Sequence, residues 1–100
     1  MADRRQYEVM FIVDPKMEDA SINTAIDRYL GVVTQRGGEI TKVDHWGRRK
    51  FAFEMRHLNE GYYAIAEVQA EPAAMDELDR VLRLQDELVR HKIVRPGPKT

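Results

Sequence analysis

The sequence has no cysteine among its 100 residues, which excludes disulfide bonds, thiolate catalysis and zinc sites with cysteine ligands. It also has no apolar run near the ~18 residues that a membrane-spanning helix needs. The apolar stretch at residues 9–13 is too short for a signal peptide. We therefore expect a cytoplasmic protein.

Residues suited to catalysis are also scarce. The histidines, His45, His57 and His91, have spacings that match no local metal-binding motif. The single serine, Ser21, falls inside a predicted helix with no histidine near it in sequence, so a nucleophilic triad is not expected. Gly37-Gly38 follows a predicted helix instead of opening one, which is the wrong place for a phosphate-binding loop. The sequence thus predicts no enzyme active site, metal or cofactor.

Length and composition are those of a single folded domain. Apolar residues make up 43% of the chain and charged residues 33%, against about 45–50% and about 25% in typical domains. The apolar content is too high for a disordered chain. A net charge of −1 excludes a uniformly basic nucleic-acid coat but leaves room for local basic patches.

The first half of the chain contains a strand and a helix. Residues 6–13 alternate as a strand, and Met10 and Ile12 make its second face apolar, which is typical of an interior strand. Residues 18–35 have helical period, and Gly37-Gly38 ends the helix because glycine accepts the left-handed conformation. The apolar stripe of this helix comprises Ile22, Ala25, Ile26, Tyr29, Leu30 and Val33.

The second half contains three strands and a helix. Residues 39–55 form a long strand whose two halves differ in parity, which predicts a β-bulge near Gly47. Residues 57–61 are predicted as a connecting loop, and residues 62–70 as a strand with small residues on one face. A helix that begins at Glu71-Pro72 and a strand at residues 88–95 complete the pattern.

This β-α-β-β-α-β order predicts an α+β, ferredoxin-like fold. Its four-stranded antiparallel sheet has the first and third strands in the middle and both helices on one face. We expect a single domain over residues 1–95 and a short flexible tail over residues 96–100.

Basic residues gather in three short stretches, although the chain as a whole is nearly neutral. These are Arg4 and Arg5; Arg48, Arg49, Lys50 and Arg56; and Arg90, Lys92, Arg95 and Lys99. Arginine offers a planar fork that suits phosphates and stacks on bases. Charges on edge strands also block aggregation, so composition alone leaves RNA binding and solvated edge charge both open.

Two other functions are known for proteins of this fold class. An RNA-recognition motif stacks bases on exposed strand aromatics, here Tyr7, Phe11, Tyr62 and Tyr63. Residues 60–67 match the signature of that motif poorly, and core packing is the expected role of at least half of these rings. A ferredoxin-like acyl-phosphate hydrolase or amino-acid sensor needs a ligand-binding loop after the first strand, and residues 14–17 offer none.

The chain resembles the family of the sixth protein of the bacterial small ribosomal subunit over about residues 4–95. The resemblance rests on residues 5–15, on residues 44–53 with their Trp-Gly-Arg-Arg run, on Gly61-Tyr62-Tyr63 and on residues 86–95. Two features depart from the family. The sequence stops at Thr100 where some members extend an acidic tail, and Phe53-Glu54-Met55 stands where members commonly have Tyr-Pro-Ile.

The resemblance implies a ferredoxin-like fold without enzymatic activity. It also implies binding to the central domain of 16S ribosomal RNA jointly with the eighteenth small-subunit protein, a small basic partner, during subunit assembly. Phosphate contacts of this kind position a protein without reading sequence. The residues expected to meet RNA or the partner are Arg4, Arg5, Tyr7, Arg48, Arg49, Lys50, Arg56, Arg90, Lys92 and Arg95.

Overall fold

Strands and helices follow one another in the predicted order. The computed structural model describes residues 4–55 and 58–95, with the backbone only for residues 51–55. The expected tail, residues 96–100, and the candidate Arg56 lie outside the described residues. The elements are β1 (Arg5–Val13), α1 (Asp19–Gln35), β2 (Glu39–Met55), β3 (Leu58–Ala70), α2 (Pro72–Leu82) and β4 (Leu88–Val94).

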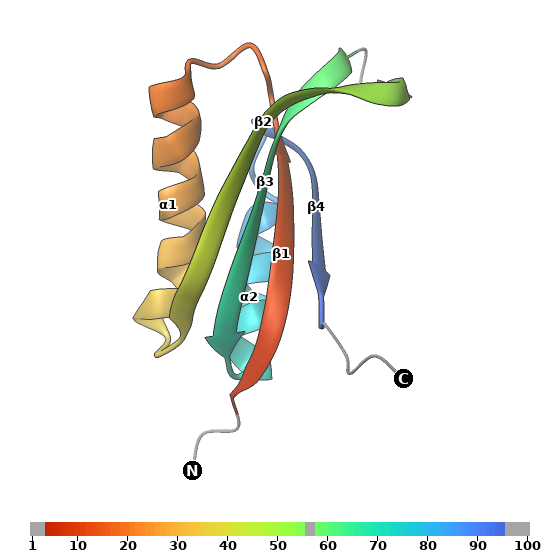
Figure 1. Ribbon diagram of the computed structural model, residues 1–100. Coiled ribbons are helices and arrows are strands. Elements are labelled where there is room, and N and C mark those ends of the chain that lie inside the picture. The colour runs from red at the N-terminus through yellow and green to blue at the C-terminus, as the bar shows by residue number, and fades with distance from the viewer. Residues whose placement is uncertain (1–3, 56–57, 96–100) are drawn as a thin grey trace.

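The described strands form one antiparallel sheet in the order β2-β3-β1-β4. The prediction that β1 and β3 are central and that β2 and β4 are edges is therefore confirmed. Both helices cover the same face of the sheet, and the outer part of the β2–β3 hairpin curves away from α1 (Figure 1). Neither helix is long and apolar enough to cross a membrane. The ferredoxin-like fold class is confirmed.

The core lies between the sheet and the helices. Alternate residues of β1 point toward the helices, and Val9, Phe11 and Val13 are fully buried there. The predicted small residues of β3, among them Ala64 and Ala66, are buried on the same face, where they let the helices approach closely. The predicted stripe of α1 is buried in full: Ile22, Ala25, Ile26, Tyr29, Leu30 and Val33.

The β2–β3 connection differs from the prediction. The sequence predicts a loop over Leu58 to Gly61, but these residues extend β3. The ladder pairs Gly61 with Arg49 and Glu60 with Lys50. Main-chain pairing with β2 outweighs the local preference of this polar, glycine-containing sequence for a turn. The remainder of the predicted loop, His57, is outside the described residues.

The bulge predicted near Gly47 is confirmed. The register between β2 and β3 shifts between His45 and Gly47, and Gly47 has a φ of +81°. Such a left-handed conformation favours glycine because it has no Cβ. A further shift between Ile40 and Lys42 was not predicted.

Two glycines follow α1, and glycine is required at each position for a different reason. Gly37 has a φ of +85° and donates its N–H to the carbonyl of Thr34, while Gly38 donates to the carbonyl of Val33. This is a Schellman motif, which satisfies the last carbonyls of the helix. Gly38 also lies tightly against the core, where a Cβ would come within 2.5 Å of Val33 Cγ1 and 3.0 Å of Ala70 Cβ.

A hydrogen-bonded cluster joins α1 to the start of β4. The hydroxyl of Tyr29 donates to the Glu87 carboxylate, and Arg28 Nη2 lies 2.9 Å from the same oxygen. The hydrogen bond from Tyr29, reinforced by Arg28, holds the pKa of the Glu87 carboxyl below its ordinary value. Burial, followed by this hydrogen bond to a carboxylate, raises the pKa of Tyr29. Glu87 is therefore an ionised anchor for the α2–β4 connection.

We predict that Gly38→Ala destabilises the protein by about 1–3 kcal/mol, because the added methyl group overpacks a filled core. The free energy of unfolding in urea measures the effect. Gly31→Ala is the matched control, since a Cβ at this position of α1 would meet nothing within 4 Å beyond the adjacent backbone of the helix. That control is expected to stabilise by about 0.5–1 kcal/mol. Equal effects of the two substitutions would contradict the prediction.

We predict that Glu87→Gln lowers the free energy of unfolding at pH 7 by about 1–2 kcal/mol. The folded-state pKa lies below the unfolded value of about 4.3. The carboxylate therefore stabilises the fold above that value, and its contribution is lost as the pH falls through the folded pKa. Urea unfolding of both proteins across this range should show the stability difference shrinking with acid. Tyr29→Phe keeps the ring and completes a double-mutant cycle, in which purely additive losses would argue against the cluster.

Candidate nucleic-acid interface

The sheet face opposite the helices presents side chains from every strand, and we call it the open face. Residues directly opposite one another on paired strands share a face, so the register defines three rows across it. The rows are Gly47, Tyr63, Ile12 and Arg90; Asp44, Ile65, Met10 and Lys92; and Lys42, Glu67, Glu8 and Val94.

The middle of the open face is apolar. Ile12 is 2% exposed although neither helix covers it, and Met10, Ile65 and Tyr63 are half-buried around it. A groove in this face is lined by Glu8, Met10, Ile65, Lys92 and Val94. Apolar side chains with one cation and one carboxylate at the margin suit contact with another protein.

Predicted cations lie on both edge strands. Arg49 stands opposite Gly61 on the open face, and Arg90 and Lys92 of β4 lie on the same face at the far edge. Lys50 follows Arg49, and Arg95 follows β4. All five side chains are exposed, and none forms an ion pair with another side chain that the structure describes. They are available for an external anion.

Arg48 has a different role from its neighbour. Its Nε donates to the carbonyl of Pro15 at 3.0 Å, Nη2 donates to that of Met17 at 2.9 Å, and Nη1 bonds Asp19 at 2.7 Å. Its guanidinium also lies 5.8 Å from the centre of the Tyr62 ring. This predicted site residue thus fastens the β1–α1 loop to β2.

The N-terminal arginines also lie close to other parts of the chain. Arg4 donates to the carbonyl of Gly37 and lies 3.5 Å from Glu39, so it joins the start of β1 to the turn before β2. Arg5 is half-buried and stands opposite Ala70 in the register. The structure separates this pair from the open-face cations.

Tyr7, a predicted contact residue, is 7% exposed and belongs to the helix-side core. Phe11 and Tyr62 are buried on the same side, which confirms core packing for most of the strand aromatics. Of those four rings, only Tyr63 stands on the open face. A row of stacking aromatics like that of an RNA-recognition motif is therefore missing from the described sheet.

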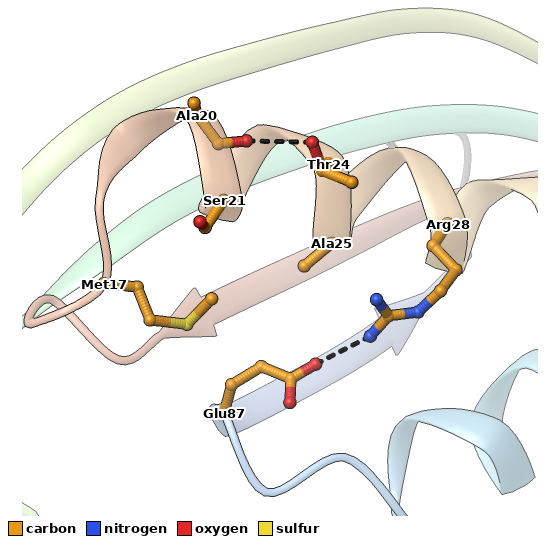
Figure 2. Close-up of a pocket in the computed structure, with 7 residues that line it drawn as sticks. All are labelled: Met17, Ala20, Ser21, Thr24, Ala25, Arg28 and Glu87. Atoms are coloured by element: carbon orange, nitrogen blue, oxygen red, sulfur yellow. Dashed lines mark hydrogen bonds and ion pairs between the residues drawn. The ribbon is translucent and has the colours of Figure 1, made fainter.

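A groove on the helix side of the molecule runs beside α1 (Figure 2). It has a volume of about 410 Å³, and its lining includes Ser21 and Thr24 of α1 beside the ion pair of Arg28 with Glu87. Ser21 has no histidine in this lining to activate it. The described residues also hold no cluster of three or more side chains able to bind a metal. The groove therefore offers no nucleophilic chemistry.

Trp46 is an exposed residue that the sequence pattern did not identify as a site residue. It is 52% exposed, beside the bulge at Gly47 on the edge strand β2. The signal that could have identified it is the position of a lone tryptophan beside a glycine and three cations in a strand.

Comparison with known proteins gives a consistent result. The protein-family model described as Ribosomal protein S6 matches residues 6–95. The small ribosomal subunit protein bS6 of Carboxydothermus hydrogenoformans is 45% identical over 91% of this chain and 95% of its own length. The bS6 protein of Desulforamulus reducens is 43% identical over 93% of this chain and 98% of its own length.

A solved structure agrees with these relatives. The crystal structure of 30S ribosomal protein S6 from Thermotoga maritima has a TM-score of 0.88 and 31% sequence identity. The match covers 93% of this chain and 88% of that one. Because sequence and fold agree over nearly the whole chain, it belongs to the ribosomal protein S6 family, whose members are non-enzymatic structural components of the bacterial small ribosomal subunit and hence cytoplasmic.

Proposed function

We propose that this chain binds the central domain of 16S ribosomal RNA together with the eighteenth small-subunit protein and so supports assembly of the subunit. One observation carries the proposal most directly. In a chain of net charge −1, five exposed cations on or beside the two edge strands lack an ion-pair partner among the described side chains. Membership of a ribosomal protein family makes RNA phosphate the natural anion for them.

The RNA contacts in this proposal come from Arg49, Lys50, Arg90, Lys92 and Arg95. Phosphate contacts from such residues fix the orientation of the protein on the RNA but do not distinguish one base sequence from another. The RNA is therefore recognised by its folded shape. The predicted residue Arg56 remains a candidate because it follows β2 in sequence. Arg4 and Arg48 support the surface by holding neighbouring segments together, and Tyr7 is set aside because it is buried.

The apolar middle of the open face is the proposed contact for the partner protein. Its centre, at Met10, Ile12 and Ile65, is flanked by the cations of β4 and by Arg49. A partner seated there would lie next to the RNA-binding cations. A basic partner would add the positive charge that this nearly neutral chain lacks, and so strengthen binding to phosphate.

An RNA-recognition-type single-strand binder is the alternative, and the burial of the aromatics argues against it. Such a protein needs exposed rings on both central strands of its open face. Here β1 places Met10 and Ile12 at the open-face positions, and its aromatic residues, Tyr7 and Phe11, face the helices. Indifference to the partner protein and equal affinity for any single strand would favour this alternative.

We predict weak binding of the chain alone to a central-domain RNA fragment, and tight, salt-sensitive binding when the eighteenth protein is added. The slope of log K against log salt estimates the number of neutralised phosphates. The double variant Arg49→Gln, Arg90→Gln should reduce that slope by about 2, roughly 1 for each lost contact.

Arg80→Gln is the matched control for this experiment. It removes one positive charge from α2, where Arg80 is bonded to Glu77 at 2.6 Å. Its salt slope should equal that of the unmodified chain. An unchanged slope for the double variant, or no gain in affinity from the partner, would contradict the proposal.

We predict that Ile65→Asp weakens association with the eighteenth protein by about tenfold or more, because a buried apolar contact of this kind is worth over 1.4 kcal/mol. Calorimetric titration of the two proteins without RNA measures the change. Leu84→Asp is the control, since Leu84 is also an exposed apolar residue, 67% exposed after α2. Comparable losses for both variants would place the partner elsewhere, and urea unfolding verifies that each variant is folded.

A further inference from the structure

Among the side chains that the structure describes, Trp46 is the most exposed aromatic residue. With 52% of its surface exposed, it leaves on the order of 100 Å² of a large aromatic side chain in solvent. Single exposed apolar residues are common on protein surfaces and need no explanation by themselves. The backbone on either side of Trp46, however, is held in place by contacts with Tyr62.

Both flanks of Trp46 are anchored to the same buried ring. On one side, His45 Nδ1 lies 3.0 Å from the hydroxyl of Tyr62, and the two rings meet edge to face at 6.0 Å. On the other side, Arg48 lies over the Tyr62 ring and makes its bonds to the β1–α1 loop. Tyr62 itself is 7% exposed in the core. Trp46 therefore projects from a backbone fixed at both ends.

The bulge contributes to this presentation. The extra residue between His45 and Gly47 interrupts the ladder, and Gly47 adopts a φ of +81°. Bulges on edge strands change the direction of a side chain and often accompany functional sites. A rigid position lowers the entropy lost when a ligand covers the ring.

The charges around Trp46 favour an anionic ligand. Arg49 and Lys50 follow within four residues and form no ion pair with a described side chain. The acid on the other side, Asp44, lies 3.5 Å from Lys42, which offsets its charge. Along a strand, Arg49 stands roughly 10 Å from Trp46, at about 3.3 Å per residue. An aromatic platform next to unpaired cations is the arrangement that single-stranded nucleic acids use for stacking and phosphate contact.

We propose that Trp46 is a stacking site for an unpaired base of the ribosomal RNA, and that Arg49 neutralises a phosphate beside that base. This inference rests on the proposed RNA binding and adds a contact to a base, which the phosphate contacts alone do not supply. Stacking tolerates any base because every base has a π-face. Trp46 thus holds an extruded nucleotide without reading its identity.

Trp46 is the only tryptophan in the chain, so its fluorescence reports directly on the site. The chain is titrated first with the eighteenth protein and then with the central-domain RNA fragment, and a parallel titration of Trp46→Phe gives the background. We expect emission to change little with the partner and to be quenched when RNA binds. Trp46→Ala should weaken RNA binding by about 5- to 100-fold with an unchanged salt slope, whereas Trp46→Phe should retain most of the affinity.

Each result distinguishes the stacking site from the wider function. Normal RNA binding by Trp46→Ala, or RNA binding without quenching, would overturn the stacking site and leave the proposed function intact. Quenching or a blue shift on adding the partner alone would assign Trp46 to the protein interface, and would also overturn it. Failure of the unmodified chain and partner to bind RNA at all would overturn both proposals. Arg49→Gln, which should lower the salt slope while Trp46 is still quenched, separates the phosphate contact from stacking.

Discussion

The packing of two helices on one face of the antiparallel sheet is the constraint on which the rest of the structure depends. Side chains of a strand alternate between faces, so each central strand gives half of its side chains to the helix-side core. Val9, Phe11 and Val13 on β1, and the alanines of β3, are used in this way. The side chains left free to meet other molecules therefore lie on the open face, on the edge strands, in the connections between elements and on the outer faces of the helices.

The same constraint explains why the open face has a mixed character. Its middle belongs to the two central strands, which have a neighbouring strand on both sides and carry apolar residues such as Ile12 and Ile65 there. Its margins belong to edge strands, where charged residues such as Arg49 and Arg90 are tolerated and protect the unpaired edges. An apolar centre between cationic margins suits the proposed contacts with a partner protein and with RNA phosphates.

Tyr62 links the stable part of the molecule to the proposed binding surface. Its ring is buried against the core, while its hydroxyl holds His45 and its face supports Arg48. Arg48 extends the connection to Met17 in the β1–α1 loop and to Asp19 at the start of α1. The part of β2 that carries Trp46 and Arg49 is thereby fixed relative to the helix layer, which lowers the entropic cost of binding.

Much of the fold and part of the site could be predicted from the sequence. Apolar residues that recur every two or every 3.6 positions are a local property of the sequence. This pattern correctly predicts the strands, the helices, the central place of β1 and the bulge near Gly47. The residues of the segment Leu58 to Gly61 favour turns, so the sequence predicts a loop where the structure has the start of β3. Its strand conformation comes from pairing with β2, and this pairing cannot be inferred from the local sequence. Residue type also suggested Tyr7 as a contact residue, but its burial comes from the core that forms between the sheet and the helices.

The arginines at positions 48 and 49 show the division between sequence and tertiary structure most clearly. The sequence by itself determined that two identical cations stand next to each other in a strand and so point to opposite faces. Only the tertiary structure decided that Arg48 meets the β1–α1 loop, 31 and 33 residues earlier in the chain, while Arg49 stands opposite a glycine on the open face. The physical reason is that local geometry fixes the alternation of side chains, whereas what each face meets depends on elements distant in the sequence.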